Sequence, residues 1–302
     1  VFYAPGNSSY WISAAGTFAF PTQQGNPDVK PEKADTYTFG LIFDSPFEGP
    51  LTRQMRLSLD YYHVKVTDAL GPQSVDIAQR QCFDPAFNPT YDANSVYCKG
   101  INRVANDGAL GNIITTYFNN GRFITSGIDL QFDWGFDAGP GRVSVNSIVS
   151  YLISLKSSEL DSDPTLEYAG TLGPTQNGLN PGAYKWKMFN TFAYHFGKWN
   201  ASLQWQHLPS ADSASKPAND AAGRATTTTG VGSYDVFALS GSFAVMKDTE
   251  IRFGVENLFD KAPPMIEVNQ SPPPGVLPGG RIDDINSDVN GRRFFLGATV
   301  KL

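Results

Sequence analysis

The chain has 302 residues, of which 17% are charged and 13% are aromatic, and its formal net charge is −6. This acidic balance argues against nucleic acid as a partner, because nucleic-acid-binding surfaces need basic patches. No run of about 18 apolar residues occurs, which excludes a transmembrane helix. The 29 glycines and 21 prolines indicate many turns, and the mean hydropathy of −0.26 suits apolar residues that are spread along strands.

Residues 1–31 show no clean alternation of apolar and polar side chains, and we expect them to form a long loop. Nine later segments alternate with period two, the pattern of strands that have one apolar and one polar face. These segments are 34–43, 53–67, 116–134, 142–155, 184–196, 199–207, 234–243, 251–256 and 294–302. In the second segment the apolar phase changes after Tyr62 to Val64 and Val66, which predicts a β-bulge. In the fourth, Tyr151 and Leu155 are expected to share one face.

The connections between these segments alternate strictly between long and short. The long ones are 69–115, 156–183, 208–232 and 258–290, and the short ones are 44–52, 135–141, 197–198 and 246–249. Membrane β-barrels have short turns at one end and long loops at the other. Aromatic residues also fall into two bands, which is the pattern of interfacial girdles. Phe43, Trp134, Phe196, Trp199 and Phe243 lie beside short turns, and Tyr61, Tyr151, Trp186 and Trp205 lie toward long loops. The sequence therefore predicts an all-β, antiparallel transmembrane β-barrel.

The two cysteines, Cys82 and Cys98, lie in one polar loop. They form either a disulfide or two free thiols, and the loop context together with the lack of other cysteines favours the disulfide. Closing a loop of that size would stabilise the fold by about 3 kcal/mol in the chain-entropy model.

The C-terminal part carries a specific resemblance. Asn257-Leu258-Phe259-Asp260, a proline-rich loop, Gly291-Arg292 and a final alternating strand are similar to the end of TonB-dependent outer-membrane receptors. The phrase at 26–32, Asn-Pro-x-x-x-Pro-Glu, also resembles that family, although this chain finishes on Leu302 where the family usually has Phe.

The resemblance implies a barrel of about 22 strands, of which this chain would supply the last nine. Residues 1–31 would form an extracellular loop, and residues 32–302 would form nine strands with short periplasmic turns and long extracellular loops. Nine strands do not complete an even-numbered barrel, and an open edge is not tolerated in lipid, so we expect the chain to be the C-terminal portion of a larger barrel.

The resemblance also implies active uptake of a scarce nutrient (a siderophore, vitamin, saccharide or peptide) across the outer membrane of a Gram-negative bacterium. The expected partners are the remaining strands and the plug domain of the receptor, TonB through a segment absent from this chain, outer-membrane lipid and the nutrient. A passive porin or surface-binding barrel is the alternative, and a soluble carbohydrate-binding β-sandwich is a further one.

The sequence contains no catalytic constellation and indicates no cofactor. His63, His195 and His207 lie on separate strands, so a shared metal site is not expected. Four aspartates, Asp161, Asp163, Asp283 and Asp284, offer only a weak calcium alternative.

The best substrate-binding candidates are loop aromatics, because flat rings stack on sugars or aromatic chelates. These candidates are Tyr3, Tyr10, Trp11 and Tyr117, with packing of the loops against one another as the alternative role. Polar residues of the strands are expected to line the barrel interior. They are Arg56, Asp60, Asp129, Gln131, Gln204, Gln206, Arg252 and Glu256.

Overall fold

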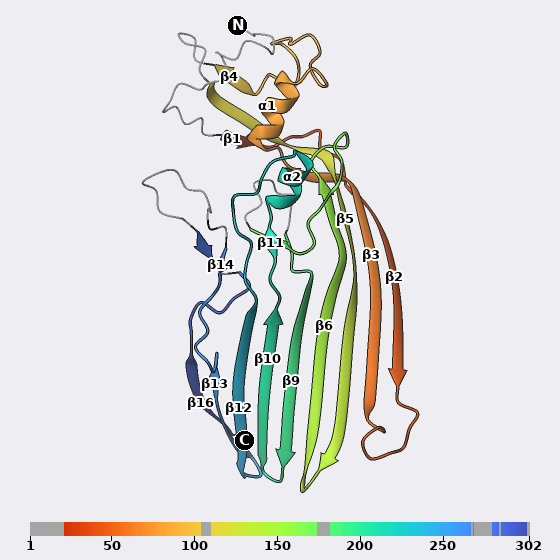
Figure 1. The fold of residues 1–302 in the computed structure, drawn as a ribbon, viewed down its shortest axis with the longest axis vertical. Coiled ribbons are helices and arrows are strands. Elements are labelled where there is room, and N and C mark those ends of the chain that lie inside the picture. The colour runs from red at the N-terminus through yellow and green to blue at the C-terminus, as the bar shows by residue number, and fades with distance from the viewer. Residues whose placement is uncertain are drawn as a thin grey trace.

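A computed structural model describes residues 21–103, 110–173, 182–266, 268, 280–283 and 285–300. One curved, open sheet dominates it (Figure 1), and its strands follow the order β16-β13-β12-β10-β9-β6-β5-β3-β2. Each strand on this path pairs antiparallel with its neighbour. The strands are β2 Lys33–Asp44, β3 Met55–Pro72, β5 Leu110–Ala138, β6 Gly141–Ser158, β9 Trp186–Phe196, β10 Trp199–Leu208, β12 Tyr234–Met246, β13 Thr249–Glu256 and β16 Arg293–Val300.

Smaller elements accompany this sheet. Strands β1 Pro21–Gln24 and β4 Ile101–Arg103 pair with β5, and β7 Leu166–Glu167 pairs with β6. Two separate ribbons are β8 Thr171–Leu172 with β11 Asp212–Ser213, and β14 Met265–Ile266 with β15 Arg281–Ile282. The helices are α1 Val75–Phe83 and α2 Lys216–Ala221. Within the described residues neither helix has the length and apolar character needed to cross a bilayer.

The alternation of long and short connections is confirmed. Figure 1 shows the tight turns together at one end of the sheet, with both helices and the long connections at the other. The two-residue turn Gly197-Lys198 links β9 to β10, and Gly197 has a φ of 55°, a conformation that glycine adopts without steric cost. We call the two ends the turn end and the loop end.

The register divides the side chains into two faces. Leu41, Leu59, Leu130 and Val149 lie in one row across β2, β3, β5 and β6 and belong to what we call the apolar face. Most of the exposed large apolar residues of β2, β3, β6, β9, β10, β12, β13 and β16 lie on this face, with Phe39 69% and Leu296 80% exposed. Soluble monomers rarely expose an apolar patch above a few hundred Å². The apolar face therefore needs a cover that the described residues do not supply.

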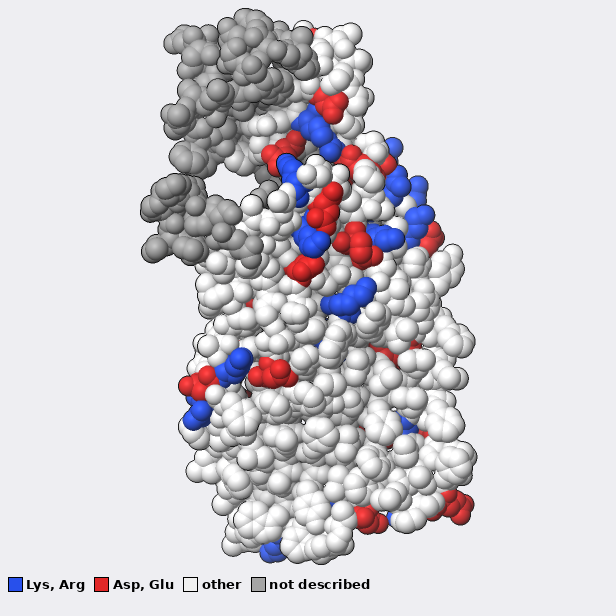
Figure 2. Space-filling model, viewed as in Figure 1, with Lys and Arg blue, Asp and Glu red and all other residues white. Residues whose placement is uncertain are grey.

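The opposite face, which we call the polar face, carries the residues predicted to line the barrel interior. The register pairs Asp60 with Asp129 and Ser58 with Gln131, and it pairs Arg252 with Ser242. Figure 2 shows charged side chains gathered around the loop end and scarce along most of the strand length on the side in view.

The two aromatic bands lie where the alternation predicts them. At the turn end, Trp199 pairs with both Phe196 and Phe243. Toward the loop end, one row joins Tyr61 through Ile128 to Tyr151 and Trp186.

The predicted bulge after Tyr62 is wrong. The β3–β5 ladder is regular there, and its irregularities lie between Val66 and Leu70, where Asp68 has a φ of 53°. The change of phase has another cause: Val64 and Val66 are half-buried on the polar face near the loop end, while Lys65 is exposed on the other face. The apolar pattern changes because the strand leaves the apolar band, and the backbone pairing stays regular.

Leu155 does not share a face with Tyr151. The β5–β6 register shifts between Ser126 and Gly127, opposite Ser154 and Leu152. The extra residue turns Leu155 to the opposite face, where it is buried.

The segment 69–115 is also more ordered than a loop. It contains the end of β3, helix α1, β4 and the first six residues of β5. The largest buried apolar cluster of the described residues likewise lies under the long connections. It consists of Tyr184, Leu208, Ala211, Val231, Tyr234 and Ile266.

Candidate functional site

The disulfide Cys82–Cys98 closes a compact unit at the loop end of β3 and β5. The two sulfurs are 2.05 Å apart, and both cysteines are buried. Asn88 fills the centre of the unit, where its Nδ2 donates to the carbonyls of Cys82 (2.9 Å) and Asp92 (3.1 Å) and its Oδ1 accepts from the Asp92 amide (3.0 Å). A buried amide that satisfies three backbone groups fixes the loop in one conformation.

Helix α1 begins this unit. The Oγ of Ser74 accepts a hydrogen bond from the Ile77 amide (3.1 Å), and Asp76 lies in the first turn beside the positive end of the helix dipole. These are local signals of a helix start that sequence reasoning could have used.

Ion pairs join α1 and β5 to the connection that follows β6. Arg80 pairs with Asp163 at 2.6 Å, and Arg122 pairs with Asp161 at 3.0 Å. Helix α1 is therefore held to the segment after β6 by the ion pair of Arg80 and Asp163. These two residues are 83 positions apart, so no local sequence pattern indicates the contact. Both aspartates were weak calcium candidates, and each already has an arginine partner.

Glu159 lies beside the Arg80 pair. Burial raises the pKa of its carboxyl to about 7, and the charges of Asp163 and Asp76 add to this while Arg80 opposes it. Arg80 Nε and the Oγ of Ser158, the residue before Glu159, are both buried without a hydrogen-bond partner. Burial also raises the pKa of Tyr168 to about 12, with a contribution from Glu159. The contact between α1 and residues 158–168 is therefore sensitive to the proton on Glu159.

Hydrogen bonds to Asp283 join the connection before β9 to the connection between β13 and β16. The Tyr184 hydroxyl donates to Asp283 Oδ2 at 3.0 Å, and Asn286 donates to Asp283 Oδ1 from its amide (3.3 Å) and its side chain (3.0 Å). Asp283 is 3% exposed, and burial together with this carboxylate raises the pKa of Tyr184. Asp283 is thus a structural acceptor in the buried cluster. Asp284 lies outside the described residues.

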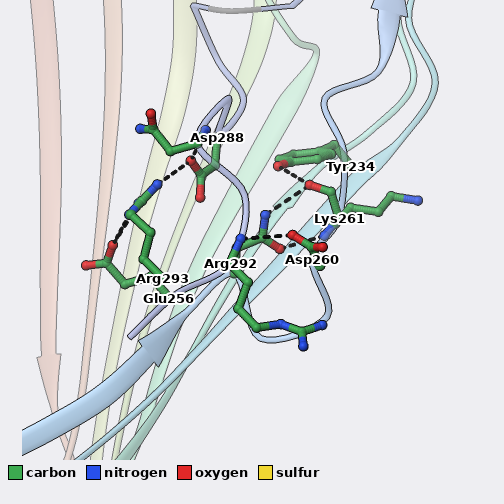
Figure 3. A network of polar contacts seen from close by, with 9 residues as sticks. Tyr234, Glu256, Asp260, Lys261, Asp288, Arg292 and Arg293 are labelled. Atoms are coloured by element: carbon green, nitrogen blue, oxygen red, sulfur yellow. Dashed lines mark hydrogen bonds and ion pairs between the residues drawn. The ribbon is translucent and has the colours of Figure 1, made fainter. Parts of the chain in front are cut away.

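The Asn257-Leu258-Phe259-Asp260 motif holds the last strand pair, and Figure 3 shows Asp260 beside Arg292 and Arg293 between Glu256 and Asp288. Asn257 is buried, and its side chain accepts from the Lys261 amide (2.7 Å) and donates to the Lys261 carbonyl (3.0 Å). Asp260 Oδ1 accepts from the Arg292 amide (2.9 Å). Arg293 bridges Glu256 (2.7 Å) and Asp288 (2.8 Å). The motif fastens the end of β13 to the start of β16.

The predicted aromatic site residues stand as follows. Tyr117 lies at the loop end of β5, opposite Pro72, and is 41% exposed. Its carbonyl accepts from the Asn26 side chain at 2.8 Å, so its backbone is held while its ring faces solvent in part. Tyr3, Tyr10 and Trp11 lie outside the described residues. Tyr97 in the disulfide unit is also exposed, and sequence reasoning did not select it.

The polar face has a cavity of about 550 Å³ at the turn end. It contains three arginines, two of which are engaged: Arg56 pairs with Asp44 at 2.6 Å and Arg53 with Asp137 at 3.4 Å. Arg142 also lines the cavity, and Gln54 Oε1 there is buried without a hydrogen-bond partner. This region offers both donors and acceptors to a polar partner.

The histidines do not converge. His207 stacks on Trp186, with ring centroids 4.7 Å apart, and its Nδ1 lies 2.8 Å from Asp235 Oδ1. His207 therefore belongs to the aromatic band toward the loop end. Over the ranges that the structure describes, no group of three or more His, Cys, Asp or Glu side chains could hold a metal ion.

These features define a class of protein: an all-β sheet with an exposed apolar face, a polar face, two aromatic bands and all long connections at one end is typical of a membrane β-barrel wall. A family model described as TonB dependent receptor-like, beta-barrel, matches residues 2–258. The chain belongs to this family, whose members are outer-membrane proteins of Gram-negative bacteria. No curated protein matches the chain.

Solved structures with the same fold include a ferric enterobactin receptor (PfeA) mutant from Pseudomonas aeruginosa, with a TM-score of 0.53 and 13% identity over 92% of this chain. The siderophore receptor PirA from Acinetobacter baumannii has a TM-score of 0.50 and 18% identity over 92% of this chain. The FrpB iron transporter from Neisseria meningitidis has a TM-score of 0.50 and 14% identity over 92%. The chain spans about a third of each of them, 32%, 33% and 32%.

Proposed function

We propose that this chain is the C-terminal part of the barrel of a TonB-dependent receptor, which takes up a scarce nutrient across the outer membrane. The chain supplies barrel wall and extracellular loops, with residues 1–31 as an extracellular loop and residues 32–302 as nine strands of a barrel of about 22. The observation that carries the proposal is the exposed apolar face. Burial of apolar area stabilises by about 25 cal/mol per Å², so leaving this face in water would be unfavourable, and lipid tails cover it without a protein partner.

The open sheet supports the need for further strands. Strands β2 and β16 end the path, and the outer edge of each pairs with no strand of the described residues. An unpaired edge costs several kcal/mol per backbone group in hydrocarbon. The remaining barrel strands of the receptor are the partners that would satisfy both edges.

The uptake mechanism assigns separate roles to the two ends. Loops at the loop end capture the nutrient, and the polar face lines the interior that the plug domain occupies. TonB, energised from the inner membrane, displaces the plug and opens a path along the polar face. The chain needs no bond chemistry for these steps, so it acts as a transporter component and not as an enzyme.

At the loop end, Tyr3, Tyr10, Trp11 and Tyr117 are our candidates for nutrient contact. The partly exposed ring and fixed backbone of Tyr117 suit stacking on a flat ligand. The similar structures share less than 20% identity with this chain, so their ligands do not identify its own. The nutrient class remains siderophore, vitamin, saccharide or peptide.

A passive porin is less well supported, because the matching family model is that of plugged, TonB-driven receptors. The test is uptake by cells that express the full-length receptor, compared with cells that lack either the receptor or TonB. The probes are ferric enterobactin, cyanocobalamin, a maltodextrin and a peptide mixture, each radiolabelled. Uptake of one probe that needs both proteins supports the proposal. Uptake that needs the receptor but not TonB would identify a passive pore instead.

A further inference from the structure

A groove of about 310 Å³ lies on the apolar face near the turn end. It is formed by side chains of four neighbouring strands, β9, β10, β12 and β13. The side chains that line it on the apolar face are Tyr194, Phe196, Trp199, Ala201, Leu239, Gly241, Phe253 and Val255. Its lining is almost wholly apolar, and it opens on the side of the sheet that faces lipid in the proposed receptor.

The groove exists because two small residues pair directly across strands. Ala201 on β10 lies opposite Gly241 on β12, and large side chains surround both. The Phe253 ring lies over Gly241, since a Cβ added to that glycine would be 2.8 Å from Phe253 Cζ. The Trp199 ring packs against Phe243 at an interplanar angle of 36°, with centroids 4.3 Å apart. Ala201 and Gly241 therefore form a low floor of the groove, and aromatic side chains form its walls.

The groove runs from the aromatic band into the apolar band. Phe196 and Trp199 belong to the band beside the turns, whereas Leu239 and Val255 lie opposite one another further along the strands. The step from Trp199 to Leu203, which pairs with Leu239, is four residues or roughly 13 Å of strand. The volume equals about ten water-sized units, at ~30 Å³ each. Its shape and chemistry suit a stretch of hydrocarbon chain.

Two lysines stand at the turn end of the same strands. Lys198 is in the β9–β10 turn and Lys247 in the β12–β13 turn, and both are exposed. Lys198 Nζ donates to the Val245 carbonyl at 3.3 Å, and within the described residues neither lysine forms an ion pair. Asp248 is the acidic residue at the same level, so the two turns together keep a net positive charge. Lysines at this depth can hold a lipid phosphate while their stems lie along apolar surface.

We propose that the groove binds one acyl chain of a glycerophospholipid of the inner leaflet, whose phosphate lies near Lys198 and Lys247. This inference rests on the proposed function, because it requires that the sheet spans the outer membrane. A second copy of the chain is a poorer occupant, since a stable protein interface buries more than about 1,000 Å² and the groove offers only eleven lining residues.

The test uses the full-length receptor in vesicles of phosphatidylethanolamine and phosphatidylglycerol. A small fraction of the phosphatidylglycerol carries a photoactivatable diazirine in the middle of one acyl chain. After irradiation, cross-linked peptides are mapped by mass spectrometry. We expect the label to concentrate on peptides that contain Trp199 and Phe253. Phe39 and Leu41 on the apolar face of β2 give the reference yield for lipid that is not held in a groove.

Two variants separate the groove from the rest of the face. Ala201→Leu fills the floor with apolar atoms, and Ala298→Leu makes the same change on the apolar face of β16, outside the groove. We expect Ala201→Leu to lower the cross-linking yield of the peptides that contain Trp199 and Phe253 about tenfold. This is the change expected when roughly two methylenes of the acyl chain lose their contact with the groove. Ala298→Leu should leave this yield unchanged, and the β2 yield reports that each variant is folded in the membrane.

A third variant tests the phosphate. The double substitution Lys198→Gln and Lys247→Gln should lower the cross-linking yield of the groove peptides about thirtyfold, which corresponds to roughly 1 kcal/mol for each of the two lost cations at the membrane surface. An unchanged yield would overturn the assignment of the phosphate.

The remaining outcomes are distinct. Equal labelling of the groove and β2, or full labelling of Ala201→Leu, would overturn the groove proposal and leave the membrane location intact. Labelling of no apolar-face peptide, β2 included, would instead contradict the proposed function. Labelling of the β2 peptides with none on the peptides that contain Trp199 and Phe253 would also overturn the groove proposal, because it would show that another occupant excludes lipid from the groove.

Discussion

Positive φ angles explain why the Asn257-Leu258-Phe259-Asp260 motif has Asn and Asp at its ends. Asn257 (φ 49°) and Asp260 (φ 54°) both adopt the left-handed region, which Asn and Asp tolerate better than most residues. Gly291 (φ 71°) faces them, and a Cβ added there would lie 2.9 Å from Asp260 Oδ1. The spacing of these residues in the sequence therefore reflects the backbone conformation that the chain adopts where it leaves β13 and enters β16.

Replacing Asp260 tests this network. Asp260→Ala removes the acceptor of the Arg292 amide and places alanine at a positive φ, which should together cost about 1–2 kcal/mol. Asp260→Asn keeps an acceptor and the tolerance for this φ, so it should change stability little. The measurement is the urea midpoint of the full-length receptor refolded in detergent. Equal midpoints for the alanine and asparagine variants would contradict the assigned role.

Glu159 makes the contact between α1 and residues 158–168 depend on pH. Its folded pKa of about 7 lies above the usual value of 4.5, so the folded loop binds the proton more tightly than the unfolded chain. The stability of this contact should therefore be greatest below pH 4.5 and fall as the pH rises to 7. Glu159→Gln should remove the dependence. Hydrogen exchange of the α1 amides at pH 5 and pH 8, corrected for intrinsic rates, measures it, and protection that rises with pH would contradict the account.

At the scale of elements, the strands could be predicted from the sequence and the loop-end units could not. Alternation along 199–207 or 251–256 is a local pattern, because each strand has one apolar face and one polar face. The start of β5 was missed because residues 110–115 pair with the short strands β1 and β4, which lie off the main path of the sheet. Arg80–Asp163 and Tyr184–Asp283 join residues 83 and 99 positions apart, and no local pattern reports such contacts.

The disulfide unit gives a prediction at this scale. Serine at both Cys82 and Cys98 removes a cross-link that closes a short loop, which should cost about 3 kcal/mol of local stability in the chain-entropy model. The barrel strands make few contacts with this unit, so the global unfolding midpoint should stay near that of the parent. Limited proteolysis should cut the double variant within residues 84–97 and leave the parent intact. Equal resistance of both proteins would show that the Asn88 hydrogen bonds alone hold the unit.

The apolar face of β10 gives a second element-scale prediction. Leu203→Arg places a charge on the lipid side of the strand and should cost about 2–4 kcal/mol near the bilayer midplane. Ser202→Arg, the adjacent residue on the polar face, is the matched control and should be tolerated. The fraction of receptor that assembles into the membrane in a heat-modifiable form measures the difference. If assembly is lost with Ser202→Arg and kept with Leu203→Arg, the assignment of the apolar and polar faces is wrong.

For the whole molecule, the C-terminal motif and the alternation of connections predict the family from the sequence alone, and the family model agrees over residues 2–258. The nutrient does not follow from the sequence, because the candidate aromatics are loop residues whose positions depend on long-range contacts. Only Tyr117 of the four lies in the described part of the chain, and no local pattern indicates that its backbone is held by Asn26. In the proposed receptor, selectivity depends on the assembled loop end and the plug together.

The most direct test of the membrane-wall account is a spin-label scan along β10. Single cysteines at 200–206 in the full-length receptor carry a nitroxide each, and the native cysteines of the described residues are already in a disulfide. Labels at Ala201, Leu203 and Trp205 should be accessible to oxygen dissolved in lipid, and labels at Ser202, Gln204 and Gln206 to a water-soluble nickel chelate. A strict alternation of the two accessibilities is the predicted result. Equal access of the nickel chelate to both sets would contradict the account.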